Sequence, residues 1–290
     1  MRKNSQTLTT QSIPALIKQL AIPASIGMFF NTMYNVVDTF YAGLISTQAI
    51  SALTLSFMIF FLIIGFGYGF SSAITALLGN ALGKKRYKLA SIYAHKGLVF
   101  VPLIGLTLSI IGYFFAPSLF MFLGAKDEYL QISLDYINPI LFGAIFFMFN
   151  FSLNSILIAT GDTKTYRNSL IFGFFANLAL NPLFMYGFLF VPAMGIKGIA
   201  FATVLIQIIN MFYLFYKVLQ TKLIHFDKLE YFIPNLRIYK LFFTHGIPSS
   251  LNMLTMAIGS LILTYFVSHY GIQAVAGYGI GYRVEQLMLL

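Results

Sequence analysis

The chain has 290 residues, of which 59% are apolar and only 9% are charged, and its formal net charge is +10 at pH 7. A soluble globular domain could not cover such an excess of apolar surface, so the composition excludes that class. Because the apolar segments are long, we expect an all-α, polytopic membrane protein.

Eight apolar segments follow one another, separated by glycine, proline and charged residues. The sequence predicts membrane-spanning helices over residues 14–44, 49–80, 92–122, 130–160, 166–190, 195–219, 241–270 and 272–290. Each except the last exceeds the roughly 20 residues that cross a hydrocarbon core. The first segment is too long for the core of a signal peptide, so we expect it to remain as a span.

The positive charges alternate between the connections. Fifteen lysines and arginines lie at one set of span ends, and only Lys126 and Lys197 lie at the opposite ends. Since cytoplasmic loops are rich in these residues, we expect a multi-pass protein of the cell inner (plasma) membrane with a cytoplasmic N-terminus. The basic residues are dispersed over several loops, which argues against nucleic acid as a partner.

The first span contains a carboxylate, Asp38. An ionised acid at the centre of a bilayer costs roughly 3 kcal/mol, so such residues usually face a cavity and bind ions or protons. Asn31 and Asn35 lie on the same helix face as Asp38, with Tyr34 beside them. Pro23 lacks an amide donor and is either a hinge of this helix or a static kink.

Two later spans hold asparagine pairs at a spacing of four residues. Asn150 and Asn154 lie in the fourth span, and Asn177 and Asn181 lie in the fifth. Amide and carboxylate oxygens suit a small cation such as Na⁺ and also bond a protonated acid. The alternative is that these amides join neighbouring helices.

The last span contains Glu285, two residues after Arg283, so the two side chains leave the helix on different faces. We interpret Glu285 as a cavity residue or a second coupling residue; a structural hydrogen-bonding role is the alternative. The histidines are too scattered along the sequence to indicate a metal centre. We therefore expect no bound metal ion other than Na⁺ at Asp38.

The sequence resembles itself at an offset of 225 residues. Residues 22–23 align with 247–248, and Thr39 aligns with Thr264, whereas Asp38 aligns with Leu263. The repeat predicts an N-terminal six-helix lobe (1–215), a cytoplasmic linker (216–240) and the start of a second lobe (241–290). Parallel repeats place the substrate cavity at their interface and allow alternating access.

Five stretches, in this order and spacing, resemble the multidrug and toxic compound extrusion (MATE) transporters. They are residues 20–23 (LAIP) with 34–43 (YNVVDTFYAG), 65–69 (GFGYG) with 79–84 (GNALGK), 153–157 (LNSIL) with 159–164 (ATGDTK), 177–182 (NLALNP) and 278–287 (YGIGYRVEQL). The resemblance implies an efflux antiporter of twelve helices in two lobes. Such a protein expels small organic, often cationic compounds in exchange for Na⁺ or H⁺, and needs no cofactor.

The resemblance also implies site roles. The acid that matches Asp38 couples ion movement, and the positions of Asn177, Asn181 and Thr203 belong to the cation site. Many relatives have aspartate where this chain has Asn181, so one anionic ligand is missing and H⁺ is favoured over Na⁺. The matching stretch of span seven, residues 252–256, lacks the glutamate of another branch, so we expect no second cation site there.

The sequence ends within the eighth span, so we expect a transporter truncated after the start of that helix, and a monomer when complete. Two alternatives stay open. One is a flippase for lipid-linked sugars, which would favour a cationic cavity; the other is a truncated paralogue or receptor that does not transport. The chain has neither an HExxH nor a GxSxG motif, so we do not expect an enzyme.

Overall fold

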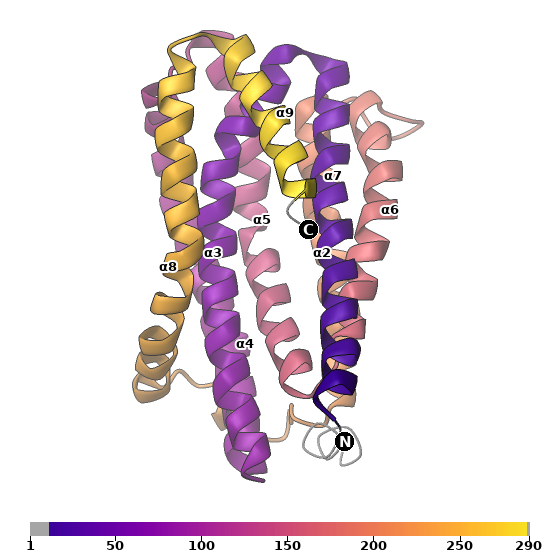
Figure 1. The fold of residues 1–290 in the computed structure, drawn as a ribbon, viewed down its shortest axis with the longest axis vertical. Coiled ribbons are helices and arrows are strands. Elements are labelled where there is room, and N and C mark those ends of the chain that lie inside the picture. Colours follow the sequence, from indigo (N-terminus) through magenta and orange to yellow (C-terminus); the bar gives the residue numbers. More distant parts are fainter. Residues whose placement is uncertain (1–11, 289–290) are drawn as a thin grey trace.

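The computed structural model describes residues 12–288, and this part of the chain consists of eight α-helices and one short 3-10 helix (Figure 1). In chain order these are α2 (Ile13–Ile45), α3 (Thr47–Gly83), α4 (Tyr87–Phe122), α5 (Asp127–Ala159), α6 (Lys164–Tyr186), α7 (Ile196–Gln220), η1 (Leu229–Tyr231), α8 (Leu236–Ser268) and α9 (Ile272–Met288). The expected all-α class is confirmed.

The helices run alternately up and down in one bundle (Figure 1). Seven of the described helices are long and apolar enough to cross a membrane, and α9 has only 17 residues. The connections 84–86, 160–163 and 221–235 lie at the end of the bundle where α2 begins, at the bottom of the view. The expectation of a multi-pass membrane protein is therefore confirmed.

The connection between the sixth and seventh spans is shorter than the linker predicted over 216–240. Helix α7 continues to Gln220, and α8 already begins at Leu236. The start of α8 is set by Asn235, whose side-chain oxygen accepts hydrogen bonds from the amides of Arg237 and Ile238, at 3.1 and 3.2 Å. Such a cap satisfies amides that have no partner inside the helix. The connection therefore comprises residues 221–235.

Helix α3 lies at the centre of the bundle and packs against α4, α5, α8 and α9. Helices α8 and α5 approach α3 closely because α3 has glycines at the two points of contact. A Cβ added at Gly69 would overlap Ser250 Oγ of α8, and one added at Gly67 would overlap the Phe151 ring of α5. Small residues of this kind let membrane helices pack backbone to backbone.

The helix boundaries repeat at the offset seen in the sequence. Helix α3 begins at Thr47 and α9 begins at Ile272, so the two starts are 225 residues apart. Helices α2 and α8, which precede them, each contain 33 residues and an internal proline. The division into lobes stays a prediction.

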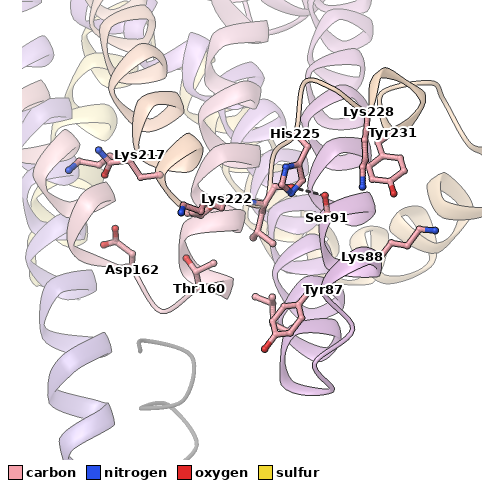
Figure 2. A pocket seen from close by; sticks show the side chains of 14 residues that line it. Tyr87, Lys88, Ser91, Thr160, Asp162, Lys217, Lys222, His225, Lys228 and Tyr231 are labelled. Carbon is pink, nitrogen blue, oxygen red and sulfur yellow. Dashed lines mark hydrogen bonds between the residues drawn. The ribbon is translucent and has the colours of Figure 1, made fainter. Parts of the chain in front are cut away.

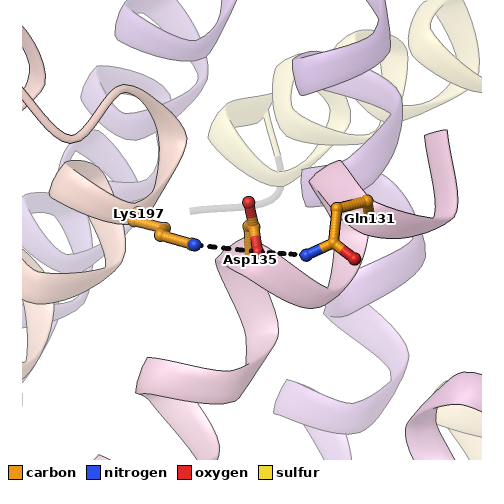
Figure 3. Close-up of polar contacts among 3 residues, drawn as sticks. All are labelled: Gln131, Asp135 and Lys197. Atoms are coloured by element: carbon orange, nitrogen blue, oxygen red, sulfur yellow. Dashed lines mark hydrogen bonds and ion pairs between the residues drawn. The ribbon is translucent and has the colours of Figure 1, made fainter. Parts of the chain in front are cut away.

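An ion pair at the opposite end of the bundle joins α5 to α7 (Figure 3). Lys197 Nζ lies 3.2 Å from Asp135 Oδ1, and Gln131 donates a hydrogen bond of 2.8 Å to the same oxygen. One of the two lysines at this end is thus neutralised by an acid. The excess of positive charge at the end where α2 begins is correspondingly greater.

Candidate functional site

Asp38 lies in the last third of α2 and is buried, with 4% of its surface exposed. Its helix packs against α6, α3, α9 and α7. Because the side chain leaves the face that is turned toward α6 and α7, it lies inside the bundle rather than against lipid. Three polar side chains from these two helices surround it.

Asp38 Oδ1 accepts two hydrogen bonds from the side-chain amides of α6. The Nδ2 atoms of Asn177 and Asn181 both lie 2.8 Å from this oxygen, and Asn181 Nδ2 also lies 3.2 Å from Asn177 Oδ1. Both asparagines are fully buried. Their spacing of four residues places both amides on one side of α6, which explains how one carboxylate oxygen can meet both.

The second oxygen of the carboxylate faces α7. Thr203 Oγ1 donates to Asp38 Oδ2 over 3.4 Å, which is a long hydrogen bond. The structure therefore brings together the four residues that the family resemblance grouped, Asp38, Asn177, Asn181 and Thr203. Their role in ion coupling stays a prediction.

A cavity of about 630 Å³ borders this cluster. Its wall comes from α2, α3, α5, α6 and α7, with Met253 as a contribution from α8. Of the side chains that line it, Asp38 and Arg167 carry a formal charge, and the other polar groups are hydroxyls and amides. The cavity lies mainly within the first six helices.

The predicted polar stripe of α2 faces this cavity. Asn31, Tyr34 and Asn35 all line it, together with Pro23. The Asn35 amide bonds to the carbonyl of Asn31, at 2.9 Å, rather than to Asp38. The polar stripe of α2 thus forms part of the cavity wall, whereas the hydrogen-bond partners of Asp38 come from α6 and α7. Helix α2 continues through Pro23, whose role as a hinge stays a prediction.

The asparagine pair of α5 also lines the cavity. Asn150 donates hydrogen bonds to the carbonyl oxygen and the Oε1 atom of Gln207 in α7, at 3.0 and 2.8 Å. The Oδ1 atoms of Asn150 and Asn154 are buried and have no hydrogen-bond partner in the described structure. Asn150 therefore joins α5 to α7, and both residues keep an acceptor oxygen without a partner in the described structure. Their role toward a substrate stays a prediction.

The sequence also carries a second polar stripe, in which Gln207 and Asn210 join Thr203. Thr203, Gln207 and Asn210 follow one another at intervals of four and three residues on α7, and all three line the cavity. Residues at this spacing share a helix face. The rule that grouped Asn31, Asn35 and Asp38 on α2 would have found them.

The structure does not place Glu285 in the cavity. Its side chain is exposed on α9 and is absent from the cavity lining. The buried charge of this helix is Arg283, with 3% of its surface exposed. Its guanidinium carbon lies 4.2 Å from the centre of the Phe57 ring, and Nη1 donates to the carbonyl of Gly279 over 2.9 Å.

The side chains of Arg283 and Glu285 leave α9 in directions roughly 200° apart, because each residue turns an α-helix by about 100°. A charged side chain inside the bilayer is costly, which is why Asp38 is a candidate functional residue. The same argument applies to Arg283.

The donors around Asp38 suit an ionised carboxylate. Asn177 and Asn181 turn their amide nitrogens toward it, an arrangement complementary to a negative oxygen. To ligate Na⁺, the amide groups would have to turn their oxygens inward. Asn181 Oδ1 has no hydrogen-bond partner within the described residues, so it can accept one. Residues 12–288 contain no cluster of three histidine, cysteine or acidic side chains that could hold a metal.

Comparison with known proteins reveals relatives along the whole chain. The sequence model of the MatE family matches residues 23–183. The Bacillus subtilis protein named "Probable multidrug resistance protein YoeA" is 30% identical over 97% of this chain and 62% of its own length. The "FAD transporter" of Shewanella oneidensis is 25% identical over 99% of this chain and 64% of its own length.

Solved structures share the fold. A multidrug resistance MATE family transporter in an inward-facing conformation has a TM-score of 0.81 and 28% identity over 94% of this chain and 61% of its own. An outward-facing MATE transporter has a TM-score of 0.79 and 26% identity over 98% of this chain and 66% of its own. The chain thus spans about three fifths of the length of these relatives.

Proposed function

Because this chain belongs to the MatE family, we propose that it is part of a transporter that exports small organic compounds across the cell membrane. Relatives of this chain are named as an FAD transporter and as multidrug resistance MATE family transporters. The observation that carries the proposal is the buried carboxylate Asp38, bonded by two amides beside a cavity large enough for a small organic molecule. Solved relatives in inward- and outward-facing conformations support alternating access.

The proposed mechanism couples export to an ion at Asp38. An ion can shift a two-state equilibrium only if it binds one state more tightly. Binding at Asp38 would rearrange its contacts with Asn177 and Asn181 and weaken the hold of the cavity on its substrate. Five further polar residues would contact the substrate, namely Asn31, Tyr34, Asn35, Asn150 and Asn154. A bend at Pro23 would let α2 move.

The same proposal names organic cations as substrates and H⁺ as the coupling ion. Asp38 is the one acid among the described residues that line the cavity, and it attracts positive charge. Asn181, which occupies the position of an acid in many relatives, leaves the site with a single carboxylate. The flippase alternative would need a cationic cavity, whereas amides and hydroxyls dominate the polar lining here. The excess of lysine and arginine at one end supports a cytoplasmic N-terminus.

A direct test uses the complete protein in inside-out vesicles from cells that lack their own drug exporters. We expect ethidium, a cationic aromatic dye, to be accumulated under an imposed pH gradient and hardly at all under an imposed Na⁺ gradient. Vesicles without the protein are the control. Absence of dye movement under both gradients would contradict the proposed function, and movement under Na⁺ alone would contradict the choice of ion.

The Asn181→Asp variant tests the ion choice separately from transport. The new carboxylate would lie beside Asp38, and two adjacent carboxylates both ionise only when a cation lies between them. We expect Na⁺ to raise the melting temperature of the variant but not that of the unaltered protein. A ligand present at about one hundred times its Kd stabilises by about 2.7 kcal/mol.

The measurement replaces choline chloride by sodium chloride at constant ionic strength. Asn154→Asp is the matched control, because Asn154 also lines the cavity but has no hydrogen bond to Asp38. Equal stabilisation of both variants, or of the unaltered protein, would show that a second acid at residue 181 does not create the Na⁺ site.

A further inference from the structure

A second cavity, of about 670 Å³, lies at the end of the bundle where α2 begins (Figure 2). Its wall comes from α4, the α5–α6 connection, the end of α7 and the connection that follows α7, with Leu82 as a contribution from α3. It has no lining residue in common with the cavity beside Asp38. The transport mechanism proposed above therefore makes no use of it.

The connection 221–235 is held against α4, which fixes this wall of the cavity. Ser91 Oγ donates to the carbonyl of Leu223 over 2.7 Å, and the amide of His225 donates to His95 Nε2 over 3.0 Å. Ser91 and His95 are buried. Further along, Lys96 Nζ donates to two backbone carbonyls of the same connection. The lysines carried by this connection therefore project from an anchored backbone.

Four lysines and a single acid line this second cavity. The lysines are Lys88, Lys217, Lys222 and Lys228. The acid, Asp162, already accepts hydrogen bonds from the backbone amide and the hydroxyl of Thr165, at 3.0 and 2.5 Å. Across residues 12–288 none of the four lysines has a carboxylate oxygen within 4.0 Å, since the single ion pair there joins Lys197 to Asp135.

Two of these lysines lie beside aromatic rings instead. Lys217 Nζ lies 5.9 Å from the centre of the Tyr213 ring, and Lys228 Nζ lies 5.5 Å from that of Tyr231. An aromatic ring holds an ammonium group without neutralising its charge. The wall of this cavity therefore keeps the positive charge of its lysines.

We propose that this lysine cavity binds an anionic phosphate group. Lysine binds phosphate as a point charge, and basic pockets between membrane helices on the cytoplasmic side bind lipid head groups. A general preference for positive loops accounts for lysines at this end of the bundle, but it does not by itself place four of them in the wall of one cavity. Lys84 and Lys85, at the same end, do not line it. The phosphate is that of an anionic phospholipid or inorganic phosphate itself.

The test measures binding of phosphatidylglycerol to the purified full chain by native mass spectrometry. The first variant, Lys222→Gln with Lys228→Gln, removes two charges from the cavity. The control, Lys84→Gln with Lys85→Gln, removes two charges from outside it. The two variants match in backbone as well, since Lys222 and Lys85 both have left-handed φ values, of 55° and 58°.

We expect the cavity variant to bind phosphatidylglycerol about tenfold more weakly or worse, and the control to stay within about twofold of the unaltered chain. Displacement of the lipid by millimolar inorganic phosphate would identify free phosphate as the ligand, and resistance to it would identify the lipid head group. Equal losses in both variants, unchanged binding in the cavity variant, or equal binding of zwitterionic phosphatidylcholine would overturn the proposal.

Discussion

Replacement of Asp38 by asparagine is expected to reduce ion-driven export strongly while the fold persists. The introduced amide has nearly the same shape as the carboxylate, and its oxygen can still accept from Asn177 and Asn181, which now bond Asp38 at 2.8 Å. It cannot bind a proton or a cation as a carboxylate does. Coupling between two ligands is typically worth about 1–3 kcal/mol, so we expect export to fall by roughly 5- to 150-fold.

The measurement is ethidium export by the complete protein under an imposed pH gradient. Asp135→Asn is the matched control, because it makes the same chemical change at a partly exposed acid that pairs with Lys197 on the surface. We expect that control to export almost normally, since surface ion pairs contribute little to stability. Unchanged export by Asp38→Asn, with a normal amount of protein in the membrane, would refute Asp38 as the coupling residue.

Replacement of Gly69 by alanine is expected to destabilise the bundle at the contact between α3 and α8. The added Cβ would overlap Ser250 Oγ, and it would lie 2.7 Å from both the carbonyl oxygen of Gly246 and the backbone nitrogen of Ser250. Two of these atoms belong to the backbone, so a side-chain rotation cannot relieve the overlap. Overpacking of this kind typically costs about 1–3 kcal/mol and sometimes more.

The measurement is the melting temperature of the purified chain, with Gly79→Ala as the control. Gly79 belongs to the same helix, but a Cβ there would meet no atom within 4 Å. Alanine in place of an unhindered helix glycine stabilises by roughly 0.5–1 kcal/mol, so the two variants should shift in opposite directions. A similar shift in both would mean that α3 and α8 do not pack this closely.

Parts of the site were predictable because helix geometry is local. The spacing of Asn31, Asn35 and Asp38 already placed them on one face, and the first two do line the cavity beside the acid. The polar stripe of α7 carried equal information at the same kind of spacing. In contrast, the grouping of Asp38 with α6 came from family resemblance, because no spacing within one helix indicates which other helix it will meet.

The sequence by itself determined the membrane class, the approximate positions of the spans, the 225-residue repeat and the anomaly of a charge, Asp38, inside a span. These follow from segment length and from the cost of charge in hydrocarbon, which are properties of the local chain. Only the tertiary structure decided that Asp38 bonds to residues 139 and 143 positions away, rather than to its own neighbour Asn35. It also buried Arg283, exposed Glu285 and gathered four lysines around one cavity. Such choices depend on how distant helices pack, since rotation of a helix about its axis decides which side chains face inward.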